Sequence, residues 1–367
     1  MRKFILLIVV FLVIGSCKQD KEEVDSEYVI SQFKKNTKEI EKVGYNVHRI
    51  DTFPSGDVWN NKGFAVVEKN EDDKIFGFSF YGKRDDYEKE YLYDNGNGFE
   101  INRAAESYRL IYVGGILGSP GGQMVVENIF HLDSIYKNVE LIEEENKYLL
   151  KYTLEPDTVY DITDRLKTLE LRKNDFFPIK VTFKANKLGK NTVTQHTLSD
   201  IKINKAGNKS ISDYKDLVSS YDVIQPTKAA PNKILNKEFP LIELSNLMDE
   251  SETVTLETDK LLLIDFWEVW CSPCIKSFPK VEELSKKYQD ELRVIGIVSQ
   301  SKESAKKLLK NKNVSFLNLI GTNNLLEEYS VNSYPRYFII DKNGIVRKEY
   351  HGFSNEIEKD LKLMISQ

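Results

Sequence analysis

Hydrophobic and polar positions follow two different patterns along the chain. Between residues 26 and 222, apolar residues recur in short runs, and turn-forming clusters such as 94–98 (DNGNG) separate several of them. This pattern predicts strands joined by short turns, as in an antiparallel meander. From residue 234 onwards, continuous apolar runs alternate with segments of helical periodicity. That second pattern predicts a mixed sheet with helices on both faces.

The first region is expected to form a β-rich α+β domain. A helix is predicted over residues 28–42, where the apolar positions include Val29, Phe33 and Ile40. Strands are predicted at 64–67, 75–81, 90–93, 148–152, 168–171, 178–183 and 192–203. The glycine-rich segment 114–122 lacks the Gly-Lys-Ser/Thr ending of a phosphate loop, so we expect a flexible loop there.

A linker and a second domain are predicted to follow. Residues 223–233 (VIQPTKAAPNK) contain two prolines and show no periodicity, as is typical of a linker. Further strands are predicted at 239–244, 253–256, 261–264, 292–298 and 316–319, and helices at 301–309, 324–329 and 354–365. The 367 residues suit two domains, at 26–222 and 234–367.

The most informative stretch is 261–279 (LLLIDFWEVWCSPCIKSFP). Its apolar start has the length of a buried strand, and Cys271 and Cys274 follow after a short turn. The next apolar residues are three or four positions apart and share one helical face: Ile275, Phe278, Val281, Leu284 and Tyr288. A Cys-x-x-Cys between a strand and a helix indicates a redox pair.

The expected chemistry follows from the start of that helix. A cysteine in the first turn directs its sulfur at unpaired backbone N–H groups and at the positive end of the helix dipole. Such a thiol has a pKa lowered from about 8.5 to between roughly 3.5 and 7.5. Pro273 fits the first turn because no intrahelical donor is lost there. We therefore expect Cys271 to be the exposed nucleophile and Cys274 the resolving thiol.

Two other interpretations of the cysteine pair are weaker. A structural zinc site needs about four ligands, whereas this chain has three cysteines and four histidines far apart in sequence. A purely structural disulfide would close only a short loop and gain little from closure. No metal or cofactor is therefore expected.

Composition and charge narrow the class of protein. A hydrophobic content of 41% permits sizeable cores, and 30% charged residues agree with a solvated exterior. Fifty-two basic and 57 acidic residues give a net charge of −5, with both signs interspersed. The chain has no block of basic residues that would indicate binding to nucleic acid.

Residues 1–17 are predicted to be a targeting signal. Arg2 and Lys3 precede an apolar run too short to span a bilayer comfortably, and 14–17 (IGSC) resembles a bacterial lipobox. That resemblance implies cleavage before Cys17 and attachment of lipid to it, which would anchor the protein stably. A plain secretory signal and an uncleaved anchor stay open as alternatives.

Residues 18–25 are expected to be a charged tether between the anchor and the first domain. Residues 18–23 (KQDKEE) also loosely resemble the surface-export tags of Bacteroidota lipoproteins. The expected location is therefore the bacterial cell envelope with the protein facing the periplasm, and surface exposure stays open.

Two motifs together carry a resemblance to a known family. Residues 265–267 (DFW) and 270–274 (WCSPC) resemble the active-site strand and helix of thioredoxin-fold proteins. Residues 333–344 (SYPRYFIIDKNG) resemble the cis-proline strand and the hairpin that follows it. Their order and spacing are similar to the TlpA/ResA-like branch of membrane-tethered thiol–disulfide oxidoreductases. The resemblance implies a thioredoxin-like α/β fold for residues 234–367.

The resemblance also implies roles for individual residues. Pro335 would follow a cis peptide bond and face the cysteines, Asp265 would relay a proton to or from the resolving thiol, and Trp270 would shield the nucleophile. A further set would border the substrate groove: Ser272, Pro273, Tyr334 and Arg336. Asp265 has an alternative as an ordinary residue at the end of a strand, and Trp267 is expected to pack in the core.

One position departs from the family pattern. Many relatives carry a glutamate three residues after the second cysteine, where this chain has Ser277. Glu268 is close in sequence on the other side and is a candidate substitute for that glutamate. The tuning of the cysteine pKa values is therefore open.

The first domain resembles LolA/LolB-like lipoprotein carriers more loosely. Segments 91–96 (YLYDNG) and 175–181 (DFFPIKV) carry this resemblance, which implies a half-barrel whose curved sheet shelters an apolar cavity. The alternative is a β-rich spacer or a domain that docks partners.

These observations predict a lipid-anchored reductase of disulfides in exported proteins, re-reduced by a membrane electron donor. One alternative is an oxidant that forms disulfides. Another is a lipoprotein that binds an apolar ligand or client, with an auxiliary redox domain and a cavity lined by aromatics such as Phe76, Phe78, Phe80 and Tyr91. A third is that the first domain only positions the redox site above the membrane.

Overall fold

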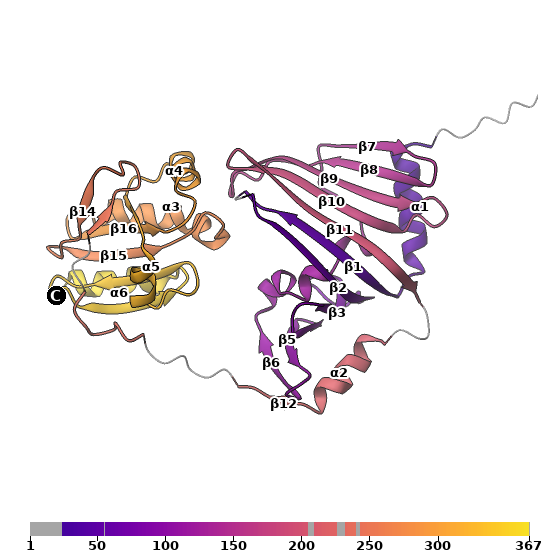
Figure 1. The fold of residues 1–367 in the computed structure, drawn as a ribbon, viewed down its shortest axis with the longest axis horizontal. Helices are drawn as coiled ribbons and strands as arrows, with labels where there is room; N and C mark the ends of the chain where they lie inside the picture. Colours follow the sequence, from indigo (N-terminus) through magenta and orange to yellow (C-terminus); the bar gives the residue numbers. More distant parts are fainter. Residues whose placement is uncertain (1–23, 55, 205–208, 226–231, 240–242, 367) are drawn as a thin grey trace, which may run out of the picture.

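The computed structural model describes residues 24–54, 56–204, 209–225, 232–239 and 243–366. Within them the chain forms a β-rich body and an α/β body (Figure 1). The predicted signal, Cys17 and nearly all of the tether lie outside these residues. Among the described residues, no helix combines the length and the apolar character needed to cross a membrane.

The β-rich body is one open sheet whose strand order is β12-β6-β5-β4-β3-β2-β1-β11-β10-β9-β8-β7. Every pairing is antiparallel except that of the short β12 with β6, and β7 and β12 form the two edges. The sheet therefore does not close into a barrel within the described part of the chain. The strands are β1 (Lys42–Thr52), β2 (Val58–Lys69), β3 (Phe78–Arg84), β4 (Glu90–Asp94), β5 (Asn97–Asn102), β6 (Ser107–Ile111), β7 (Asn138–Glu143), β8 (Lys147–Thr153), β9 (Ile162–Arg172), β10 (Pro178–Lys187), β11 (Lys190–Ile203) and β12 (Asp222–Val223).

Helices cover both faces of this sheet. Helix α1 (Ser26–Lys38) packs Val29 and Phe33 into the larger core cluster, on the face that also holds Phe78 and Phe80. Helix α2 (Ile211–Ser219) packs on the opposite face, where Tyr214 stacks on Tyr81 with ring centroids 3.8 Å apart. The sheet is thus buried on both sides over β3 and β4.

The predicted helix over residues 28–42 is too long at its C-terminal end. Helix α1 begins after Asp25, whose side chain accepts a hydrogen bond from the Tyr28 N–H, and it ends at Lys38. Residues from Lys42 instead enter β1, with Val43, Tyr45 and Val47 buried at alternate positions. This period of two is the signature of a strand with one buried face, and it starts where the helical pattern stops.

The glycine-rich segment predicted as a flexible loop is packed into the sheet. It forms the 3₁₀ turns η1 (Val113–Gly118) and η2 (Gly122–Met124), with η3 (Glu127–Ile129) after them. The side chains of Ile116 and Met124 are fully buried. A Cβ atom on Gly121 would lie 2.2 Å from the carbonyl oxygen of Gly82, so only glycine permits this approach of two backbones.

The α/β body is built on a sheet of order β17-β16-β15-β18-β19. Strands β15, β16 and β17 pair in parallel, whereas β18 pairs antiparallel with both of its neighbours, β15 and β19. The strands are β15 (Leu261–Phe266), β16 (Leu292–Val298), β17 (Leu317–Ile320), β18 (Arg336–Ile340) and β19 (Val346–His351). The helices are α3 (Ser272–Lys287), α4 (Lys302–Asn311), α5 (Asn323–Glu328) and α6 (Asn355–Ile365), and β13 (Glu243–Ser245) pairs with β14 (Thr253–Thr255) in a separate hairpin.

Side chains of β15 alternate between two core clusters. Leu261 and Leu263 pack with residues of α3, α4 and α6, whereas Leu262 and Ile264 pack on the other face with Leu325 of α5. Helices therefore cover both faces, as the sequence predicted, and this is the thioredoxin-like arrangement. The redox stretch leaves the sheet from its central strand.

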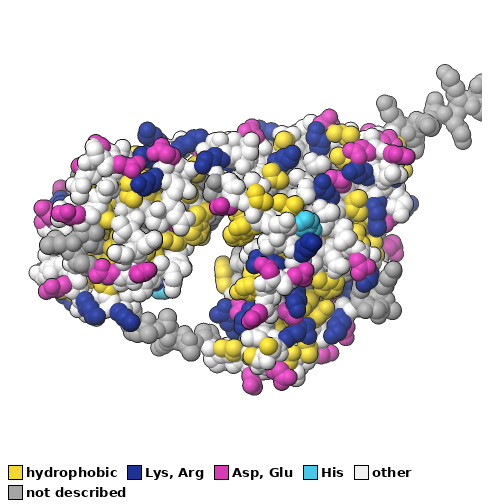
Figure 2. All heavy atoms as spheres, viewed as in Figure 1, with side chains coloured by type: hydrophobic (Ala, Val, Ile, Leu, Met, Phe, Trp, Pro, Cys, Tyr) yellow, Lys and Arg dark blue, Asp and Glu magenta, His cyan; other side chains and the backbone are white. Residues whose placement is uncertain are grey.

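The two bodies touch through turns at one end of the large sheet. Leu188, between β10 and β11, is 6% exposed and belongs to the core cluster of the α/β body. Asn311 at the end of α4 donates a hydrogen bond of 2.7 Å to Asp161, and Lys312 donates one of 2.5 Å to the Thr158 carbonyl. Hydrophobic side chains lie where the bodies meet (Figure 2).

Candidate active site

The cysteine pair occupies the junction between β15 and α3. Cys271 is the N-cap of α3, and its sulfur accepts a hydrogen bond of 3.2 Å from the Cys274 N–H. The two cysteines are joined by a disulfide. Cys271 keeps 3% of its surface exposed and Cys274 keeps none, so the nucleophile is less open than the sequence suggested, although it is still the outer sulfur.

The start of α3 favours negative charge on Cys271. Its sulfur lies beside the unpaired N–H groups of the first turn and at the positive end of the helix dipole. Pro273 stands in this first turn and is exposed, while Ser272 is half-buried. When the disulfide opens, this environment favours the thiolate form of Cys271.

An aromatic pair borders the cysteines. Trp270 is 55% exposed, and its ring meets that of Tyr334 edge to face with centroids 5.5 Å apart. The Trp270 indole N–H donates to the Gln300 side chain at 3.2 Å. The Tyr334–Pro335 peptide bond is cis, and Pro335 is buried.

Arg336 points into the protein and away from solvent. Its guanidinium donates to Glu349 at 2.5 Å and to Asn332 and Ser333 at 3.0 and 2.9 Å. The Arg336 side chain is 4% exposed and that of Glu349 is 9% exposed. These bonds fix the segment that leads to Pro335. The Arg336 guanidinium therefore supports this segment from its buried side.

Asp265 lies in β15 and is fully buried. Neither carboxylate oxygen has a hydrogen-bond partner of normal geometry among the described residues. Burial raises the pKa of Asp265 well above its usual value. A carboxyl group in this setting can hold a proton at pH values where an exposed aspartate is charged.

Glu268 and Ser277 have different surroundings. Glu268 is buried and accepts hydrogen bonds from the Ser299 N–H and hydroxyl and, at 3.3 Å, from the Gln300 N–H. Burial raises its pKa, and these bonds oppose the rise. Ser277, at the position where the family resemblance implied a glutamate, bonds to the Cys274 carbonyl and to the Tyr337 hydroxyl. Whether Glu268 replaces that glutamate stays a prediction.

Tyr337 and Ser299 are site residues that the sequence analysis missed. Tyr337 pairs with Asp265 directly across β15 and β18, and Ser299 follows β16 and holds Glu268. Residue 337 is two positions after Pro335, so strand alternation could have placed it near the cysteines. Ser299 left no comparable signal because its contact depends on how β15 and β16 pair. Trp267 is fully buried as predicted, and its N–H donates to Asn318 at 2.9 Å.

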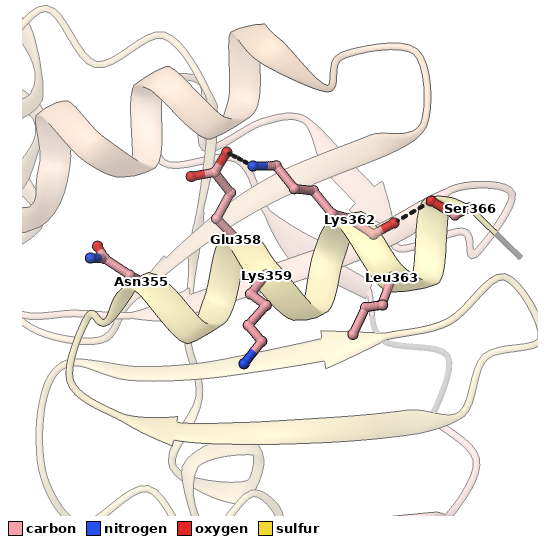
Figure 3. A pocket seen from close by; sticks show the side chains of 6 residues that line it. All are labelled: Asn355, Glu358, Lys359, Lys362, Leu363 and Ser366. Atoms are coloured by element: carbon pink, nitrogen blue, oxygen red, sulfur yellow. Dashed lines mark hydrogen bonds and ion pairs between the residues drawn. The ribbon is translucent and has the colours of Figure 1, made fainter.

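A surface pocket elsewhere does not involve these residues. It has a volume of about 380 Å³ and lies along α6, between side chains such as Asn355, Lys359 and Leu363 (Figure 3). Glu358 and Lys362 on its wall form an ion pair of 3.1 Å. The pocket is shallow and lined by side chains of a single helix, so we assign it no role.

A strand that ends at a Cys-x-x-Cys, a helix capped by the first cysteine and an opposing Tyr-Pro segment define a thioredoxin-fold redox protein. Residues 234–365 match the Redoxin family. The thiol–disulfide oxidoreductase ResA of Bacillus cereus is 30% identical over 144 residues, which cover 38% of this chain and 77% of ResA. The chain therefore belongs to the ResA-type thiol–disulfide oxidoreductases.

Other similar proteins relate to the same part of the chain. The thioredoxin-like protein YneN of Bacillus subtilis is 29% identical over 35% of this chain and 77% of its own length. Among solved structures, the exposed lipoprotein thioredoxin of Streptococcus pneumoniae is 28% identical, covering 35% of this chain and 100% of its own, with a TM-score of 0.30. A thiol:disulfide interchange protein from Bacteroides sp. is 19% identical, covering 36% and 91%, with a TM-score of 0.33.

Proposed function

We propose that this protein is a lipid-anchored reductase of disulfides in exported proteins, held in the bacterial cell envelope through Cys17 and facing the periplasm. The observation that carries the redox role is the Cys271 sulfur at the N-cap of α3, with Cys274 buried one turn behind it. The lipobox-like residues 14–17 support the anchor. The family to which the chain belongs supports the reaction class.

The reaction begins with the reduced pair. The Cys271 thiolate attacks one sulfur of a client disulfide, forms a mixed disulfide and releases the other client sulfur as a thiolate, which takes a proton from solvent. Cys274 then loses its proton and attacks the Cys271 sulfur. The Cys271–Cys274 disulfide forms, and the second client sulfur leaves as a thiolate and is protonated. Two electrons pass to the client, and a membrane electron-donor protein restores the dithiol.

The residues around the pair have defined parts in this proposal. Asp265 accepts the proton of Cys274, and Trp270 covers the outer sulfur. The client strand passes along Tyr334 and Pro335 beside Ser272 and Pro273, where a cis proline leaves the preceding backbone free to pair with it. Arg336 holds the Tyr334–Pro335 segment in place from its buried side.

The alternative of an apolar-ligand protein has little support in the β-rich body. Phe78 and Phe80 are 1% and 0% exposed and pack on each other with centroids 6.3 Å apart. Phe76 and Phe80 both pack on Tyr93. These aromatics fill a core where the ligand hypothesis required a cavity.

Redox titration of the full chain tests the proposal. A potential near that of thioredoxin, roughly −270 mV, supports a reductase, whereas one near roughly −120 mV, as for the strong oxidant DsbA, reverses the direction of electron flow. In parallel, Cys274→Ser should trap mixed disulfides with envelope clients, because Cys271 attacks but cannot be released. The matched Cys271→Ser variant should trap none. Equal trapping by both variants would contradict the assigned roles.

A further inference from the structure

Three polar side chains from different elements meet behind Cys274. Asp265 of β15 and Tyr337 of β18 are directly opposite each other in an antiparallel ladder. Opposed residues in such a ladder project to the same face of the sheet. Asp265 shares this face with Leu263, which packs with Cys274 in one core cluster. Ser277, one turn after Cys274 on α3, completes the group and is 5% exposed.

The number of available hydrogens fixes the direction of the hydrogen bonds in this group. The Ser277 hydroxyl oxygen lies 2.8 Å from the Cys274 carbonyl oxygen and 2.8 Å from the Tyr337 hydroxyl oxygen. A carbonyl can only accept, and a serine hydroxyl has one hydrogen, so Ser277 donates to Cys274. The bond between Ser277 and Tyr337 must then use the phenolic hydrogen of Tyr337. No hydrogen is left on Tyr337 for Asp265.

Because the phenolic hydrogen of Tyr337 points to Ser277, Asp265 receives no hydrogen bond from Tyr337. Both of its oxygens lack a partner among the described residues, and a buried carboxylate without donors is costly to ionise. Among the described residues, the titratable group that faces it across the sheet is Tyr337 from β18. From β16 it is paired with a glycine, Gly296, and α6 contributes apolar side chains such as Leu361.

We propose that Ser277 and Tyr337 are positioning residues that hold the phenolic hydrogen away from Asp265 and so keep Asp265 as a neutral acid while the disulfide is closed. The use of this acid rests on the proposed reductase function. When the disulfide is reduced, the Asp265 proton passes to the Cys274 thiolate. In the next cycle the Cys274 thiol returns that proton to the Asp265 carboxylate before attacking the Cys271 sulfur.

Substitutions of the two residues are expected to affect Asp265 differently. Ser277→Ala releases the phenolic hydrogen, which can then turn to the carboxylate and lower the Asp265 titration midpoint by about one pH unit. Tyr337→Phe removes a phenol whose hydrogen already points to Ser277, so it takes no donor from Asp265 and should not lower the midpoint. The double variant should behave like Tyr337→Phe, because without the phenol the serine has nothing to release.

The experiment is a pH titration of the full chain in its disulfide form, observed by NMR of carboxyl-labelled aspartate. Asp265→Asn identifies the signal, and neither cysteine titrates in this form. Ser277→Thr retains a hydroxyl and should keep the parent midpoint. Ser315→Ala removes a serine that bonds a different carboxylate, Glu282, and should also leave the midpoint unchanged.

A lowered midpoint in Ser277→Ala that is absent from Tyr337→Phe and from the double variant supports the inference. A lowered midpoint in Tyr337→Phe, or an unchanged one in Ser277→Ala, overturns it. Should Tyr337→Phe fail to fold, the contrast between Ser277→Ala and Ser277→Thr decides alone. The titration needs no client, so a parent protein without reductase activity would overturn the proposed function and leave this result standing.

Discussion

Burial dominates the titration of the single carboxyl group of Asp265 and raises its pKa well above the ordinary value. Above the ordinary aspartate pKa, the folded protein therefore keeps a proton that the unfolded chain releases. Because the folded state then binds more protons, its stability falls as the pH rises toward the folded pKa.

Asp265→Asn should remove this pH dependence. With the disulfide closed, the free energy of unfolding of the variant relative to the parent should rise with pH from about 4 upwards, by up to about 1.4 kcal/mol for each pH unit. Denaturant titrations at a series of pH values measure the difference. The new amide adds a cost independent of pH, so only the slope is diagnostic, and parallel curves would contradict a raised pKa.

Gly296 is required by a close contact behind the active-site strand. A Cβ atom there would lie 2.0 Å from the Asn318 side-chain oxygen and 3.0 Å from the Trp267 indole nitrogen. Gly296→Ala should therefore break the bond between these two side chains and destabilise the protein by about 1–3 kcal/mol. Chemical denaturation measures this cost. Gly115→Ala, whose Cβ meets nothing within 4 Å, should cost less than about 0.5 kcal/mol.

At the scale of elements, the sequence predicted segments whose signal is local. Strand β15 and helix α3 were found because a continuous apolar run precedes a clear helical face. Strand β1 was missed because its alternation of Val43, Tyr45 and Val47 directly follows a helix, and the helical pattern was extended over its start. Strands β6 and β7 were missed because they lie toward the edges of the sheet, where burial is partial and alternation is weak.

In the candidate site, too, the residues of the local motif could be predicted, whereas contacts between distant segments could not. The motif supplied Cys271, Cys274 and Asp265, because each lies at a fixed distance along the chain from the others. The inward direction of Arg336 and the bond between Tyr337 and Ser277 depend on tertiary packing. A single sequence holds no direct record of such contacts.

The segment before Pro335 depends on one buried ion pair between neighbouring strands. Glu349→Ala would leave the Arg336 guanidinium buried without its carboxylate, and we expect a loss of about 3–5 kcal/mol in the free energy of unfolding. Glu303→Ala removes a carboxylate that is 85% exposed in an ion pair with Lys306 and should cost less than about 1 kcal/mol. Equal losses in thermal or chemical unfolding would show that burial of the pair does not matter.

At the scale of the whole molecule, the turn that carries Leu188 supplies an apolar contact between the two bodies, beside the hydrogen bonds to Asp161 and Thr158. Leu188→Asp should place a charge in this apolar contact and separate the bodies, increasing the radius of gyration in small-angle X-ray scattering. Val58→Asp is the matched control, because Val58 is 60% exposed. Val58 is the first residue of β2 and pairs with Thr52 at the end of β1, and Thr52 also pairs with Val193 of β11 near the same end of the sheet. Unchanged scattering for Leu188→Asp would show that the contact does not hold the bodies together.

The pairing of β1 with β11 also bears on how the protein is made. These strands lie side by side at the centre of the large sheet, and Val43 is paired with Ile203. A chain emerging from a ribosome or a membrane pore presents β1 long before its partner exists, and pairing strands so distant in sequence is intrinsically slow. Until residue 203 arrives, the edges of β1 and β10 are open to other chains. The β-rich body is therefore the part of this protein most exposed to misassembly during synthesis. The strands of the α/β body are closer in sequence, so that body can complete itself within one short stretch of synthesis.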